Sequence, residues 1–288
     1  MNDAKRIVII FHEQQRHRSV DWYLISKMAE LWRDDGLEVR NVFGVDEFVP
    51  ADLSILHIDL SVVPEEYLEL ASRYPITLNG RVRDIRKSSF SKNLLDQHND
   101  YDGKVVVKTD LHYAGVPERE LLLSRRQRLW FRFLRGVAKR SPVGRWLYPL
   151  AIEQPTDYRI FDSLMDVPRA CFDDPRTVVE RFLPEQDGDD YFVLWYFFLG
   201  NRSTCFRLAS KNPIVNHLTY CSMKKVEPHP DIVRLRKELG FDYGHFDYVV
   251  RGGEAILFDI NTIVGTQGLK ETAEVLEHLA AGIYSYFA

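Results

Sequence analysis

The 288-residue sequence lacks the cysteine pattern and the long apolar runs that mark secreted and membrane-spanning proteins. Its three cysteines, Cys171, Cys205 and Cys221, are odd in number, widely spaced and without metal-ligand spacing. A disulfide framework is therefore not expected, and we predict a cytoplasmic location. No stretch approaches the roughly 20 apolar residues of a membrane span, and the apolar run near the N-terminus is too short for a signal peptide.

The sequence also lacks a strong excess of either charge, with 38 Lys and Arg against 42 Asp and Glu. A formal net charge of −4 excludes a global attraction to nucleic acid or to an anionic membrane, so we expect neither partner. Any basic surface must be local. Apolar and charged contents of 45% and 28% are typical of a globular protein, and the length suits two or three lobes.

The first eighty residues alternate between strand and helix patterns. The order β-α-β-β-α-β predicts a small open α/β sheet. The predicted strands are residues 5–11, 37–43, 52–59 and 75–80, and the predicted helices are 19–36 and 64–74. A polar, basic stretch at 81–97 follows, which we interpret as helical and as a lobe boundary. We predict an N-terminal lobe at 1–85, a small lobe with a basic helical insert at 86–175, and a C-terminal lobe at 176–288.

The remaining chain contains strands, a helical pattern at 118–137 and a closing hairpin. The predicted strands are 101–110, 176–183, 191–200 and 202–210, and further helices are predicted at 231–240 and 268–288. The hairpin reads FDYVVRGGEAILFDINTIVG, from Phe246 to Gly265. Asp247, Asp259 and Asn261 interrupt its apolar runs, although carboxylates are poor strand formers.

The position of these acids depends on the glycine turn. A three-residue turn at Gly252–Glu254 would place Asp247 directly opposite Asp259, whereas a two-residue Gly252-Gly253 turn would place Phe258 there. In the first register the two carboxylates and the Asn261 amide converge, which suits Mg²⁺. The alternative is that Asp259 and Asn261 merely end a strand while Asp247 is exposed.

Three upstream segments are typical of nucleotide binding. Lys108 ends an apolar strand beside a loop containing Gly115, as a phosphate-binding cation would. Glu180 lies where an apolar strand runs into a proline-containing bend, which can offer backbone groups to an adenine edge. Asp190 precedes a long strand and could accept hydrogen bonds from ribose hydroxyls.

In this order the segments resemble the ATP-grasp superfamily over most of the chain. The motifs are VVVKT, VVERFL and the closing hairpin with a D…(D/E)-x-N pattern. The resemblance implies an α+β two-lobe ATP-grasp fold behind the open α/β N-terminal lobe. It implies that Lys108 contacts phosphate and that Asp247, Asp259 and Asn261 hold Mg²⁺ bridging the phosphates of ATP. The hinge residues implied to contact adenine are Glu180, Arg181, Phe182 and Leu183.

The sequence departs from the superfamily pattern at several positions. Asp259 stands where many members have Glu, the loop after Lys108 has one glycine, and the strand after the hinge lacks its usual arginine. We predict that Arg207 replaces that arginine in steadying a transferring phosphoryl group. Of Lys87 and Lys92 we choose Lys92 as the second phosphate lysine, because we expect it to open a helix.

The resemblance implies an ATP-dependent ligase that activates a carboxylate as an acyl phosphate for attack by an amine, releasing ADP and phosphate. The expected partners are therefore small carboxylate and amine substrates, with a homodimer left open. The alternatives are a small-molecule kinase on the same fold and a catalytically inactive nucleotide-binding regulatory protein.

Two other features allow more than one interpretation. Between Ser124 and Leu150 there are eight Lys or Arg residues and no acid. This helix could be a lid packed on the small lobe through Leu129, Trp130, Phe133, Leu134 and Val137. It could instead draw in an acidic substrate through Arg126, Arg132 or Arg135, or dock on an anionic membrane or partner. His57 and Asp59, at the end of a strand, are either ligand-facing or structural.

Overall fold

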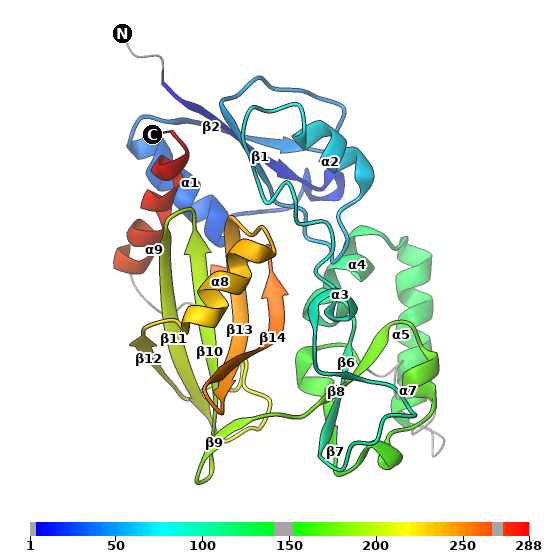
Figure 1. Ribbon diagram of the computed structural model, residues 1–288. Coiled ribbons are helices and arrows are strands. Elements are labelled where there is room, and N and C mark those ends of the chain that lie inside the picture. The colour runs from blue at the N-terminus through cyan, green and yellow to red at the C-terminus, as the bar shows by residue number, and fades with distance from the viewer. Residues whose placement is uncertain (1–3, 141–151, 267–272, 288) are drawn as a thin grey trace. The chain divides into compact units, whose positions relative to one another are not determined.

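A computed structural model describes residues 4–140, 152–266 and 273–287, which divide into two compact units (Figure 1). The second unit is the continuous segment Ile85–Glu185, and the first unit comprises the residues before and after it. Among the helices of the described residues, none is long and apolar enough to cross a bilayer.

The N-terminal part of the first unit is the predicted open α/β sheet. Its four strands are parallel and lie in the order β2-β1-β3-β4. They are β1 (Arg6–Phe11), β2 (Glu38–Phe43), β3 (Leu53–Leu56) and β4 (Thr77–Leu78), with helices α1 (Leu24–Asp34) and α2 (Glu65–Ala71). Strand β3 is buried throughout, as expected for a parallel strand that is covered on both faces.

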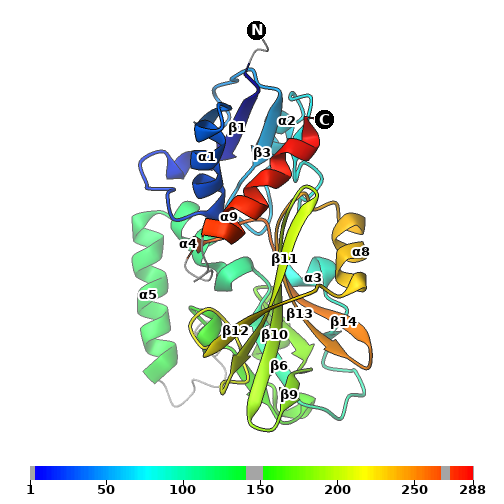
Figure 2. The same ribbon diagram turned by 90° about the vertical axis from the view of Figure 1, so that its left-hand side faces the viewer.

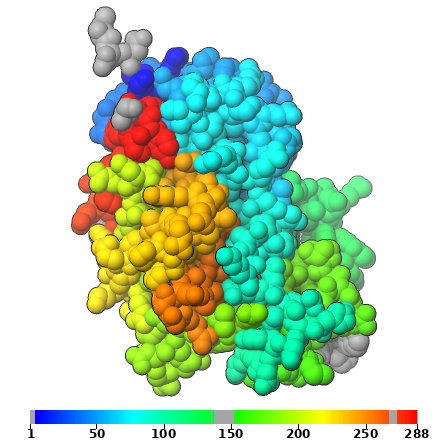
Figure 3. Space-filling view, in the orientation of Figure 1, coloured from blue at the N-terminus to red at the C-terminus, as the bar shows by residue number. Residues whose placement is uncertain are grey.

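The C-terminal part of the first unit is an antiparallel sheet in the order β12-β11-β10-β13-β14, with β9 pairing beside β10. The strands are β9 (Glu185–Asp187), β10 (Asp190–Leu199), β11 (Arg202–Ser210), β12 (Ser222–Val226), β13 (Tyr243–Arg251) and β14 (Glu254–Asn261). Helices α8 (Pro230–Glu238) and α9 (Ala273–Ala280) lie on opposite faces of this sheet (Figure 2). Helix α8 forms part of the outer surface (Figure 3).

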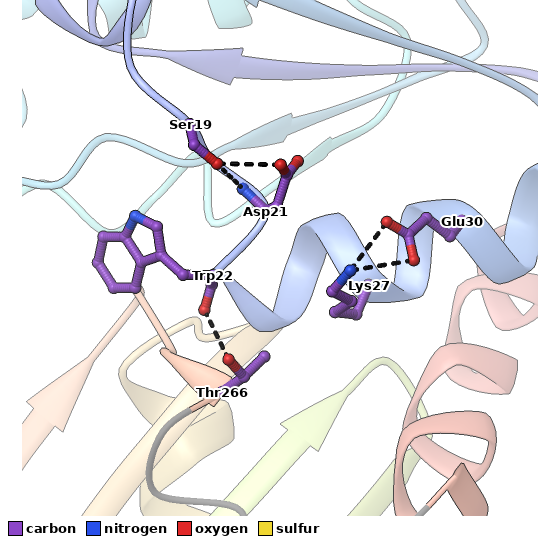
Figure 4. Close-up of polar contacts among 6 residues, drawn as sticks. All are labelled: Ser19, Asp21, Trp22, Lys27, Glu30 and Thr266. Carbon is purple, nitrogen blue, oxygen red and sulfur yellow. Dashed lines mark hydrogen bonds and ion pairs between the residues drawn. The ribbon is translucent and has the colours of Figure 1, made fainter.

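Hydrogen bonds join these two sheets into one unit. The backbone N–H of Leu24, at the start of α1, donates to the Val264 carbonyl at 2.8 Å, just after β14. Thr266 Oγ1 donates to the Trp22 carbonyl at 3.1 Å (Figure 4). One hydrophobic core accordingly contains side chains of both β1 and β10.

The second unit contains an antiparallel sheet in the order β5-β8-β6-β7. Its strands are β5 (Leu94–Leu95), β6 (Val105–Thr109), β7 (Arg159–Phe161) and β8 (Thr177–Arg181), and its helices are α3 (Lys87–Phe90), α4 (Val116–Leu121), α5 (Arg125–Arg140) and α7 (Ala170–Asp173). Strand β8, which the sequence-based division assigned to the C-terminal lobe, pairs with β6 in this sheet. The division into three lobes stays a prediction.

One local prediction was wrong. Residues 81–97 do not form a continuous helix, because β5 pairs with β8 and leaves only the short α3. The expected loop after Lys108 contains a tight turn, His112–Gly115, that runs into α4. Part of the helix predicted at 268–288 lies outside the described residues, and the described part consists of α9 and a 3-10 turn.

Candidate active site

The hairpin β13–β14 places its two acids opposite one another, but not through the turn we expected. The turn has two residues, Gly252 and Gly253, because Arg251 pairs with Glu254. A regular ladder from that turn would put Phe258 opposite Asp247. The register instead shifts between Tyr248, which faces Leu257, and Asp247, which faces Asp259. Phe258 is therefore the extra residue of a β-bulge, and bulges re-aim side chains in this way.

The bulge brings four polar side chains to one face of the sheet. Asp247 pairs with Asp259, and His245 pairs with Asn261. Residues two apart on a strand share a face. His245 Nε2 lies 2.8 Å from Asp247 Oδ1 and 3.5 Å from the Asn261 amide nitrogen. Sequence reasoning missed His245, although its place two residues before Asp247 was sufficient to find it.

Asn261 is the most deeply buried member of this group, with 3% of its surface exposed. Its Oδ1 has no hydrogen-bond partner among the described residues. Gly244 allows the close approach of its backbone, because a Cβ at that glycine would collide with the Asn261 carbonyl oxygen. Burying an amide oxygen without a hydrogen-bond donor costs free energy. The Asn261 oxygen is therefore suited to bind a group that the protein itself does not supply.

The oxygen donors on the hairpin fit Mg²⁺. This ion takes one or two protein carboxylates and completes its shell with water and phosphate oxygens. Asp247 and Asp259 supply the carboxylates, and Asn261 supplies a neutral oxygen. Within the described part of the chain, no group of three or more His, Cys, Asp or Glu side chains is arranged to hold a metal ion. A cation here would therefore depend on water or phosphate for most of its ligands.

In the second unit, Lys108 and Glu180 form a buried ion pair on adjacent strands. Lys108 Nζ lies 2.7 Å from Glu180 Oε2, and the Glu180 side chain is 1% exposed. Ser91 Oγ donates to the other carboxylate oxygen of Glu180. Glu180 thus anchors the candidate phosphate lysine, and an adenine contact by Glu180 stays a prediction.

Two of the other hinge residues, Arg181 and Phe182, form backbone hydrogen bonds within the second unit. The backbone N–H of Arg181 donates to the Asn93 carbonyl at 2.9 Å, and that of Phe182 donates to the Lys104 carbonyl at 2.8 Å. Phe182 and Leu183 are half-buried, whereas Arg181 is exposed. Adenine contacts by these residues stay a prediction.

The reason given for choosing Lys92 was wrong, because this residue is exposed and begins no helix. Lys87, the alternative, is 2% exposed and its Nζ donates to the Leu111 carbonyl at 3.4 Å. Lys87 therefore supports the chain segment that leads from β6 into α4. A phosphate contact by Lys92 is untested.

The structure does not bring Arg207 together with the hairpin acids. Asp247 pairs with Trp195 of β10, whereas Arg207 pairs with Leu194, so the two side chains point to opposite faces of the sheet. The Arg207 guanidinium lies over the Phe192 ring, 3.5 Å from its centroid. Asp190 forms an ion pair with Lys211 at 3.0 Å, and a ribose contact by it stays a prediction.

His57 and Asp59 are buried at the end of β3. Asp59 Oδ2 accepts a hydrogen bond from the Tyr23 hydroxyl at 2.7 Å. His57 packs against the rings of Phe11 and Tyr23, with centroids 5.0 and 4.7 Å away. Burial lowers the pKa of His57 to about 3, so its ring is neutral at pH 7. Neither ring nitrogen of His57 has a hydrogen-bond partner among the described residues, so both interpretations of His57 stay predictions.

Comparison with known proteins gives a fold but no sequence relative. No protein-family model matches the chain, and no curated protein matches its sequence. A RimK domain ATP-grasp protein from Sphaerobacter thermophilus is similar in structure, with 11% identity and a TM-score of 0.50, covering 97% of this chain and 99% of that one. D-Alanine–D-alanine ligase from Bacillus anthracis gives 12% identity and a TM-score of 0.48, covering 99% of this chain and 96% of that one. Macrocyclase MdnB from Microcystis aeruginosa gives 11% identity and a TM-score of 0.46, covering 99% of this chain and 100% of that one.

Of these three likenesses, the RimK domain protein reaches a TM-score of 0.5, and at 11% identity it shows the fold alone. The chain has the ATP-grasp fold, with an open α/β sheet at its N-terminus. The ATP-grasp fold predicted from the sequence is therefore confirmed.

Proposed function

We propose that the chain is an ATP-dependent carboxylate–amine ligase that uses Mg²⁺. The observation that carries this proposal is the bulged register of the hairpin, which sets Asp247 opposite Asp259 beside the unpaired oxygen of Asn261. Two carboxylates that face one another repel, and a divalent cation between them removes that cost. On an ATP-grasp fold, such a cation is the natural counter-ion of nucleotide phosphates.

The proposed reaction has two steps. A substrate carboxylate oxygen attacks the γ-phosphorus of ATP, which forms an acyl phosphate and releases ADP. The amine then attacks the acyl carbon, which forms the amide bond and releases phosphate. Bound Mg²⁺ would neutralise the phosphate charge that develops in the first step.

The chain's own residues supply the positioning. Lys108 is the candidate phosphate cation, and its pairing with the buried Glu180 and the hydrogen bond from Ser91 fix its place on β6. Asp247 is oriented by the contact with His245 Nε2 at 2.8 Å. Arg207 has no part in this proposal, because it lies on the other face of the sheet.

The test measures ADP release with mixtures of amino acids and carboxylates in the presence of hydroxylamine. Hydroxylamine intercepts an acyl phosphate as a hydroxamate, so a carboxylate-dependent hydroxamate is the expected result. ADP release without hydroxamate, together with a phosphorylated alcohol, would identify the kinase alternative. ATP binding without turnover on any acceptor would contradict the ligase and leave the inactive nucleotide-binding protein.

A further inference from the structure

Helix α5 exposes a cluster of large apolar side chains that the described part of the chain leaves uncovered. Leu129, Trp130 and Phe133 are 57%, 59% and 61% exposed. The Trp130 and Phe133 rings stack with centroids 5.8 Å apart, so they form one continuous patch. We call these three residues the apolar patch. Patches of this kind on a soluble surface mark interaction sites.

Of the interpretations left open for this helix, packing on the small lobe does not hold for these three residues. The half-buried residues of this stretch are Phe131 and Leu134. At about 100° per residue, Phe131 lies well away from the patch, whereas Leu134 lies next to Trp130, so one edge of the patch adjoins the half-buried side of the helix. Helix α5 lies along the outside of the second unit in both ribbon views (Figures 1 and 2).

The apolar patch is bordered by positive charge. Arg125, Arg128 and Arg132 recur at i, i+3 and i+7, so they line one side of the helix, and all three are exposed. Arg126 is exposed beside the patch. No acid occurs between Ser124 and Leu150, so the helix has no negative charge of its own to balance these arginines.

We propose that α5 docks on an anionic phospholipid surface, a property separate from the proposed ligase activity. An interfacial helix needs Trp, Phe and Leu on one side to enter the acyl boundary, with Arg or Lys beside them to meet lipid phosphates. The arrangement on α5 has both parts in adjoining positions. An acidic peptide fits less well, because the patch lies on the convex surface of a helix.

The expectation of no membrane partner rested on the net charge of −4, which averages over the whole chain. Attraction to an anionic surface acts within about 8 Å at physiological salt, so the local charge of α5 decides the outcome. The binding should therefore require anionic lipid and weaken as salt is raised.

The experiment is flotation of the full chain with vesicles of phosphatidylcholine alone or with 30% phosphatidylglycerol, at low and physiological salt. We expect binding to the anionic vesicles only, reduced by salt. Replacing Leu129, Trp130 and Phe133 together by Gln should reduce the bound fraction by at least about tenfold, as should R128E with R132E. All five residues are exposed, so circular dichroism should show unchanged folding.

Matched controls are Met165→Gln, which removes an apolar side chain that is 94% exposed elsewhere in the second unit, and Lys225→Glu on β12. Both should bind vesicles as the wild type does. No binding to anionic vesicles at low salt, or equal binding by the triple-Gln variant, would overturn the proposal. An acidic peptide that binds α5 while vesicles do not would assign the surface to a protein partner and overturn it equally.

A third occupant is the chain itself. Quenching by acrylamide, compared between the wild type and W130F, reports the exposure of Trp130. We expect protection on adding anionic vesicles and none on adding ATP with Mg²⁺. Protection by the nucleotide alone would mean that the protein covers its own patch, and it would contradict membrane docking without bearing on the ligase reaction.

Discussion

The environment of the Glu180 side chain depends on contacts that its sequence context does not show. The pattern VVERFL predicted a hinge, and β8 pairs with both β5 and β6, which encloses the Glu180 carboxylate beside Lys108. A buried carboxylate needs a cation and hydrogen bonds to offset its lost hydration. Neither the antiparallel pairing nor the two-residue strand β5 is visible in local propensities, so this ion pair could not have been predicted.

His57 makes the stability of the first unit depend on pH. Burial lowers its pKa from the usual 6.5 to about 3, so the unfolded chain binds a proton at pH 5 that the folded chain does not. Stability from this group is complete above about pH 6.5 and is lost as the pH falls toward 3. Between pH 7 and pH 5 the loss should be about 2 kcal/mol.

The measurement is urea unfolding of the wild type and His57→Phe at both pH values. The variant keeps a ring among Phe11 and Tyr23 but cannot titrate, so its free energy of unfolding should fall by about 2 kcal/mol less than that of the wild type. His12 and His217, whose pKa values are also lowered by burial, titrate in both proteins. Identical pH dependence in the two proteins would show that His57 is accessible to protons in the folded state.

The hairpin β13–β14 shows which features of an element can be derived from sequence. Alternation correctly placed Asp259 and Asn261 on one face, and the two glycines correctly marked the turn. The length of the turn was wrong, and the register survived only because Phe258 bulges. A bulge depends on packing across strands, which a single sequence does not display.

Gly244 should be indispensable to this hairpin. Its φ is 151°, and a Cβ there would collide with the Asn261 carbonyl oxygen, so Gly244→Ala must push β14 away from β13. We expect a loss of at least about 3 kcal/mol in the free energy of unfolding. Gly252→Ala is the control, because its φ is 59° but a Cβ there meets nothing within 4 Å. It should cost about 1 kcal/mol.

Urea unfolding of both alanine variants decides the point. Greater destabilisation at Gly244 than at Gly252 is the predicted order, and a Gly244→Ala chain that fails to fold while Gly252→Ala folds agrees with it. Equal losses in the free energy of unfolding would mean that β13 and β14 do not approach closely at Gly244 and Asn261.

Across the whole chain, the order of elements carried more information than any single motif. The alternation of strands and helices predicted the N-terminal sheet, and three ordered motifs predicted the ATP-grasp fold. Contacts between distant segments were not predictable. Residues 264–266 join the start of α1, so one unit is built from both ends of the chain. Nor did the overall charge of −4 reveal that α5 presents arginines beside exposed aromatic rings.

The central claim, that the hairpin is a magnesium–nucleotide site, is tested most directly by calorimetric titration of ATP with Mg²⁺ and with EDTA. Asp259→Asn removes one carboxylate, and Glu254→Gln, an exposed acid at the turn of the same hairpin, is the control. The wild type and Glu254→Gln should bind ATP at least about tenfold more tightly with Mg²⁺ than without it. Asp259→Asn should fold normally and lose at least about tenfold in affinity with Mg²⁺, roughly 1.4 kcal/mol. A folded Asp259→Asn chain with unchanged magnesium-dependent affinity would contradict the claim.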